Sequence, residues 1–151
     1  VALEKLSGEL ACDHATPEDL ERVREAGRRM EETFYSAERI DSFETDMAFH
    51  TTIAEASRND ALARTHKAYL ARLWHARYLT SRMRENRERV LTQHGAILDA
   101  LLVRDKAALA TAFDAHLGNL PKDLENLMIS QMRDDPKKPE KPGEKETHET
   151  S

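Results

Sequence analysis

The sequence predicts an all-α protein with long amphipathic helices, on three observations. Its 151 residues are strongly polar, with 34% charged and only 5% aromatic side chains. The alternating pattern of β-strands is absent, whereas apolar residues recur at three- and four-residue spacing. The five glycines and five prolines are few, and most of the prolines lie near the C-terminal end. Long, uninterrupted helices are therefore expected.

The chain opens in a segment that already has helical spacing, with an apolar stripe at Leu3, Leu6 and Leu10. Because natural chains rarely begin inside a helix, we expect an N-terminal part to precede Val1. The next helix has a clear start, since Thr16 can cap it and Asp19 can complete a capping box. Its predicted apolar face is Leu20, Val23, Gly27, Met30 and Phe34.

The two middle helices also have start signals. Asp41 with Glu44 forms a second possible capping box, and the segment from Ser57 to Asp60 breaks the pattern and offers caps for the next helix. The predicted buried positions are Phe43, Met47, His50 and Ala54 in the first, and Leu62, His66, Tyr69, Leu73 and Ala76 in the second, which should end past Tyr78.

The last helices form a predicted hairpin around a turn at Arg104–Asp105. Pro121 should break the second of them before it resumes towards Met132. We expect residues 133–151 to be a disordered charged tail, because proline, lysine and glutamate dominate there. Residues 1–132 would then be the folded domain. The predicted buried positions of the hairpin are Val90, His94, Ile97 and Leu101, followed by Leu109, Phe113, His116 and Leu120.

Four metal-capable residues lie in register on these faces. Asp46 and His50 are four residues apart and share one side of a helix. His94 and His116 stand about equally far from the predicted turn, so an antiparallel hairpin places both roughly 15 Å from it, side by side. Buried imidazoles are costly to desolvate without partners, and a divalent cation would supply one. We therefore predict a metal site.

The donor set does not dictate the metal. Imidazole suits zinc, nickel, iron and copper, and the carboxylate also admits manganese. Zinc is our first choice. A coordination shell larger than four would leave room for water or for the carboxylate of a ligand.

A run of basic residues lies between Asp60 and Glu85, with no acidic residue inside it. It can be a solvated helix face or a local positive field that attracts a small anion. On the second interpretation, Arg77 is our first candidate for effector binding, because it projects near the Leu73 stripe, and Arg72 is the second.

Other classes of function are disfavoured. The net charge of −5 makes the chain a poor binder of polyanions. Cys12 is the only cysteine, so no internal disulfide can form and a cytoplasmic location is expected. No apolar run approaches the length of a membrane span.

The chain also resembles a known family in a series of motifs from about Leu3 to Leu120. In order, these are Thr16-Pro17-Glu18-Asp19-Leu20, Asp46-x-x-Phe49-His50, Ile53-Ala54-Glu55-Ala56-Ser57-x-Asn59, His94-x-x-Ile97-Leu98-x-Ala100-Leu101 and Ala115-His116-Leu117. It resembles the FCD domain, the C-terminal ligand-binding domain of the FadR subfamily of GntR transcription regulators.

The resemblance implies an antiparallel bundle of six or seven helices that binds an organic-acid or sugar-acid effector. It implies a metal held by Asp46, His50, His94 and His116, and a homodimer that would contact DNA only through an N-terminal winged-helix domain. No winged-helix sequence precedes Val1, so we expect no DNA reading by this chain alone. An arginine that family members often carry near the start of the first helix is also missing here.

Two alternatives remain open. A metal-dependent hydrolase or oxygenase in a helical bundle would need further carboxylates, and the predicted buried faces offer only Asp46. A metal-stabilised interaction module would lose stability with its metal but bind no effector. We expect a sensor domain and no enzymatic activity.

Overall fold

The computed structural model describes residues 1–36, 38–82 and 87–133, which contain seven helices and no strand. The predicted all-α bundle is confirmed. The predicted tail lies almost wholly outside the described residues. The helices are α1 (Ala2–His14), α2 (Pro17–Ser36), α3 (Arg39–Ala56), α4 (Asp60–Arg82), α5 (Arg87–Leu102), α6 (Lys106–Leu117) and α7 (Leu120–Arg133).

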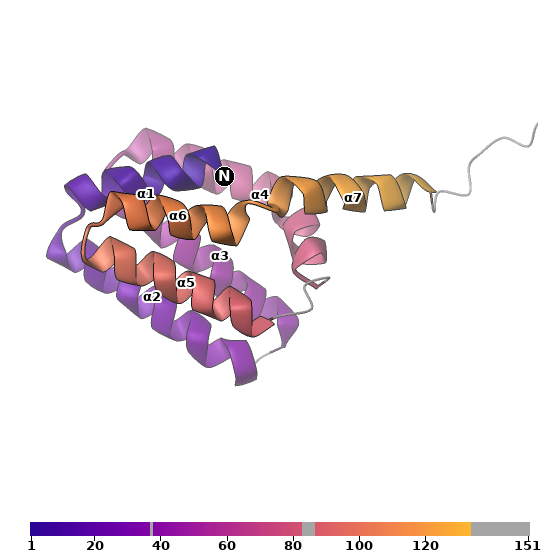
Figure 1. The fold of residues 1–151 in the computed structure, drawn as a ribbon, viewed down its shortest axis with the longest axis horizontal. Coiled ribbons are helices and arrows are strands. Elements are labelled where there is room, and N and C mark those ends of the chain that lie inside the picture. Colours follow the sequence, from indigo (N-terminus) through magenta and orange to yellow (C-terminus); the bar gives the residue numbers. More distant parts are fainter. Residues whose placement is uncertain (37, 83–86, 134–151) are drawn as a thin grey trace, which may run out of the picture.

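The helix α3 lies inside the bundle and packs against α1, α2 and α4, while α5 and α6 pack against one another and against α2 and α1 (Figure 1). The main core lies between these elements and includes Phe49, Ile97 and Phe113, all fully buried. At one end, α7 extends beyond the other helices (Figure 1). Within the described ranges, none of the helices is long and apolar enough to cross a membrane.

Most predicted helix boundaries are confirmed. Asp105 accepts a hydrogen bond from the backbone N–H of Ala108 at 2.9 Å, and Asn59 caps α4 through the N–H of Leu62 at 3.0 Å. Pro121 lies in the first turn of α7, where its missing N–H costs nothing. One start was wrong: α3 begins at Arg39, two residues before Asp41, and no side chain caps it.

The buried face of α1 differs from the predicted leucine stripe. Leu6 is 45% exposed, whereas Glu4, Ser7, Gly8 and Ala11 are buried. The physical reason is close packing on α6, because a Cβ atom on Gly8 would lie 2.7 Å from Phe113 Cε2. Small residues therefore face the core, and the leucines turn towards the edges. A smaller correction concerns α4, in which Leu70 is buried in place of Tyr69, which is 46% exposed.

The capping box at the start of α2 is formed as predicted and extends into an ion-pair cluster. Asp19 accepts hydrogen bonds from the Thr16 backbone N–H at 2.9 Å, from Arg22 at 2.6 Å and from Arg58 at 2.5 Å. Burial raises the pKa of Asp19, but these hydrogen bonds outweigh it and hold the pKa well below its ordinary value.

We expect Asp19→Asn to destabilise the domain by about 1–3 kcal/mol at neutral pH, because hydrogen bonds to a buried carboxylate are lost. The folded-state pKa lies below the unfolded-state value of about 3.9, so this contribution is complete above pH ~5 and is lost as the pH falls below ~4. Urea unfolding with chelator present should show that the difference in unfolding free energy between wild type and variant becomes smaller in acid. Glu31→Gln, which changes an exposed acid on the same helix, is the control. If the stability difference between wild type and Asp19→Asn were the same at pH 3 as at pH 7, the stabilising role of the ionised Asp19 would be contradicted.

Candidate metal centre

The four predicted ligands come together from three helices. Asp46 and His50 lie one turn apart on α3, His94 lies on α5, and His116 lies on α6. One ligand atom from each residue lies within 4.8 Å of the other three. The hairpin of α5 and α6 brings the rings of His94 and His116 to 4.1 Å between centroids.

The group is buried, and its polar atoms face one another. The three histidines are almost inaccessible to solvent, and the Asp46 side chain is 18% exposed. Asp46 Oδ1 lies 2.5 Å from His94 Nε2 and 3.5 Å from His50 Nε2. Despite these short distances, the three atoms form no aligned hydrogen bond with other described residues. Converging donors without mutual hydrogen bonds are typical of ligands arranged around a cation.

The contacts of the His94 ring show which of its two nitrogens faces Asp46. Its Nδ1 lies 2.8 Å from the Val90 carbonyl oxygen, which can only accept, so Nδ1 carries a proton. In the neutral ring, Nε2 then presents a lone pair to the Asp46 carboxylate, whose oxygen also carries lone pairs. A proton or a bound cation has to compensate the repulsion between these two atoms. The donor set of three imidazoles and one carboxylate fits a divalent cation, with Nε2 of His94 and Oδ1 of Asp46 among the possible ligands.

The other two histidines also have partners at Nδ1. Gln93 donates a hydrogen bond to the Ala115 carbonyl at 2.8 Å and places its own Oε1 at 3.5 Å from His116 Nδ1. His50 Nδ1 lies 3.3 Å from Glu4 Oε2. Such outer partners orient metal-binding imidazoles and select the tautomer with Nε2 free.

Glu4 is the buried charged residue at the site that the sequence analysis missed. It is a second buried carboxylate beside the site, so the expectation that Asp46 is the only one was wrong. Besides His50, Glu4 contacts His66 Nε2 at 2.9 Å and Arg77 Nη1 at 3.6 Å. The spacing of Glu4 with Ser7, Gly8 and Ala11 is the signal that could have placed it on the inner face of α1.

The buried carboxylates and His50 shift one another's pKa values. Burial lowers the pKa of His50, but Glu4 and Asp46 outweigh this effect and raise it to about 9. Burial likewise raises the pKa of each carboxyl, while the neighbouring histidines hold it well below its ordinary value. Two ionised carboxylates around buried imidazoles favour a bound positive charge, as a proton or as a metal ion.

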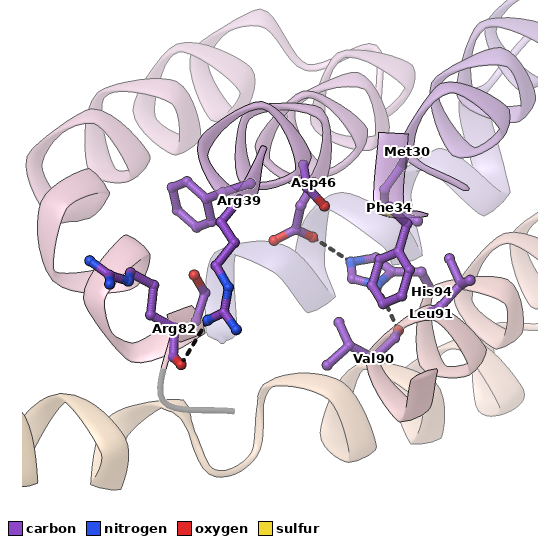
Figure 2. Close-up of a pocket in the computed structure, with 11 residues that line it drawn as sticks. Met30, Phe34, Arg39, Asp46, Arg82, Val90, Leu91 and His94 are labelled. Atoms are coloured by element: carbon purple, nitrogen blue, oxygen red, sulfur yellow. Dashed lines mark hydrogen bonds and ion pairs between the residues drawn. The ribbon is translucent and has the colours of Figure 1, made fainter. Parts of the chain in front are cut away.

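A cavity of about 70 Å³ borders the site on the side of Asp46 and His94 (Figure 2). Phe34, Phe43 and Leu91 contribute apolar walls, and Arg39 contributes positive charge. The Arg82 guanidinium points away from Asp46 and His94 (Figure 2) and lies 6.0 Å from the centroid of the Tyr78 ring. Arg39 donates a hydrogen bond to the Arg82 backbone carbonyl at 3.2 Å, which ties α3 to the end of α4. The cavity thus lies beside Asp46 and His94 and has the positively charged side chain of Arg39 in its lining.

The two arginines predicted to bind an effector lie elsewhere. Arg77 is buried, pairs with Glu4, and lines a different cavity with Leu117 and Leu120. Arg72 is exposed on α4. Their role in effector binding stays a prediction.

Comparison with known proteins defines the class. The family model of the FCD domain matches residues 1–119, so the chain belongs to the FCD-domain family and the predicted family is confirmed. Among solved structures the chain is similar to E. coli McbR/YncC, with 17% sequence identity and a TM-score of 0.64 over 87% of this chain. This likeness shows the shared fold, and the chain spans 63% of the length of that protein. No curated protein matches the sequence.

Proposed function

We propose that this chain is the ligand-sensing domain of a GntR-type transcription regulator that binds a small carboxylate effector at a buried divalent metal. Asp46, His50, His94 and His116 would hold the metal, with zinc as the first candidate. The observation that carries the proposal is the convergence of one ligand atom from each of these four residues within 4.8 Å, with Asp46 Oδ1 and the Nε2 atoms of His50 and His94 in no aligned hydrogen bond with other described residues.

The cavity beside Asp46 and His94 supports the effector class. When bound, the metal supplies a Lewis-acidic position that a carboxylate oxygen can occupy. Arg39 would pair with further oxygens of an organic acid, and the apolar wall from Phe34 and Phe43 would contact its carbon chain. The effector would have to bind one arrangement of a homodimer better than another to influence a linked DNA-binding domain.

The position of Glu4 argues against a hydrolytic enzyme. A general base must reach the metal-bound water directly or through one further water. Glu4 contacts Nδ1 of His50, the nitrogen on the opposite side of the ring from the Asp46 contact, so the imidazole separates it from the site. A second carboxylate is thus present, but it is placed to orient a ligand.

The test is elemental analysis of protein purified without added metal, followed by melting curves with a panel of organic acids and sugar acids. We expect about one transition metal per chain and a rise in melting temperature with some acids only in metal-loaded protein. With Arg39→Ala, we expect that about tenfold more effector is needed for the same rise in melting temperature. Arg64→Ala, an exposed arginine of α4 outside the cavity, is the control and should respond as wild type does.

Two outcomes would overturn parts of the proposal. Absence of bound metal, together with no response to zinc, nickel or manganese, would exclude the metal site. Metal binding without a response to any carboxylate would favour a metal-stabilised interaction module.

A further inference from the structure

The buried carboxylate of Glu4 joins three helices at a point that the metal ligands do not explain. Glu4 lies on α1, its Oε2 faces His50 of α3 and His66 of α4, and its Oε1 faces Arg77 of α4. All four side chains are at most 6% exposed. An ionised carboxylate at such a position needs compensating partners, and Arg77 supplies a permanent positive charge.

Arg77 and His66, both on α4, contact the Glu4 carboxylate at 3.6 and 2.9 Å. Glu4 Oε2 also lies 3.3 Å from His50 Nδ1, within ion-pair distance but outside hydrogen-bond alignment. The other ring nitrogen, His50 Nε2, lies 3.5 Å from Asp46 Oδ1, so a proton held on Nδ1 by Glu4 would leave Nε2 as the donor that faces the site.

We propose that Glu4 is a positioning residue for the metal, and that through His50 it couples the docking of α1 to metal binding. This inference rests on the proposed metal site and adds a residue that contacts no metal itself. Glu4 accepts the Nδ1 proton of His50, so that Nε2 is the nitrogen available to the ion. Because Glu4 links α1 to His50 of α3 and to His66 and Arg77 of α4, binding of the ion should hold α1 more firmly on α3 and α4.

The first test is the metal affinity of Glu4→Gln, measured by competition with a chromophoric chelator. Loss of an outer carboxylate partner of a metal-binding histidine weakens binding about 10- to 100-fold, and we expect a loss in that range. Glu9→Gln, an exposed glutamate on the same helix, should bind as wild type does. The Co²⁺-loaded variant should also have a changed visible absorption spectrum, because the His50 ring is no longer fixed.

The second test needs no variant. Hydrogen exchange of the wild-type protein, with and without Zn²⁺, should show slower exchange of α1 amides when the metal is bound. Glu4→Asp, which keeps the charge but withdraws the oxygens, should fold and show both a weaker affinity and less added protection of α1. These two measurements keep the inference testable if Glu4→Gln does not fold.

The outcomes separate this inference from the proposed function. Wild-type protein without metal affinity would refute the metal site. If both Glu4 variants bind metal with wild-type affinity and the Co²⁺ spectrum is unchanged, only the positioning role of Glu4 is refuted. The same holds if hydrogen exchange of α1 in the wild type does not change when metal binds. If the Glu4 variants lose the same thermal stability with and without metal, and their metal affinity is unchanged, Glu4 is only an ion-pair partner of Arg77.

Discussion

His94→Ala is expected to abolish metal retention and with it most of the thermal stabilisation that the metal provides. His94 supplies the nitrogen closest to Asp46, and its Nδ1 is already fixed by the Val90 carbonyl. A ligand present at 1,000 times its Kd stabilises the native state by about 4 kcal/mol. For a domain of this size that amounts to about 8–16 °C in melting temperature. Melting curves and elemental analysis, before and after chelation, measure both effects.

The matched control is His75→Ala, because His75 is exposed on α4. It should keep the metal and melt as wild type does. Chelator should lower the melting temperature of wild type and of the control, and should leave His94→Ala nearly unchanged. Retention of one metal per chain by His94→Ala would show that the ion binds at another place.

The α5–α6 hairpin and its pair of histidines could be predicted because every signal there is local. Asp105 caps α6, and Arg104 adopts the left-handed φ of 56° that a sharp reversal requires. The helical rise then determines that His94 and His116 lie side by side. The same holds for Asp46 and His50, whose four-residue spacing is a property of one helix.

The inner face of α1 could not be predicted from its leucines, because it depends on the neighbouring helices. A helix that approaches another closely buries its smallest side chains, and Gly8 packs directly on Phe113 and Leu109. With its small residues packed on α6, α1 turns Glu4 towards the interior, where His66 and Arg77 of α4 contact its carboxylate. A charged residue is normally assigned to the surface from sequence alone, so Glu4 was missed for the same reason.

The cavity beside the site is likewise a tertiary feature. Arg39 and Arg82 are distant in the sequence, and neither lies on a predicted apolar face. They meet because α3 begins two residues earlier than its capping signal indicates, which places Arg39 in the first turn, where it reaches the carbonyl of Arg82. Helix starts are the least certain part of a sequence-based prediction, and here two residues decide which arginine borders the cavity.

Phe49→Ala is the substitution for which we expect the largest loss of stability in the metal-free protein. Phe49 is fully buried on α3, and its ring lies within 3.5 Å of the Cβ position of Gly27 on α2. The ring also contacts His50 and His94 edge-on, with centroids 5.7 and 5.5 Å apart. Removing a buried phenylalanine ring costs about 3–5 kcal/mol, or about 6–20 °C here. Urea unfolding with chelator present isolates this packing effect.

The same ring holds two predicted metal ligands in place, so metal affinity should fall as well, although Phe49 offers no donor atom. Tyr35→Ala is the matched control, because Tyr35 is an aromatic residue that is 70% exposed, and its loss should change stability by no more than about 0.5 kcal/mol. If Phe49→Ala loses stability but keeps wild-type affinity, the imidazoles are held by their Nδ1 partners alone. In that case Val90, Gln93 and Glu4, rather than core packing, would determine the geometry of the site.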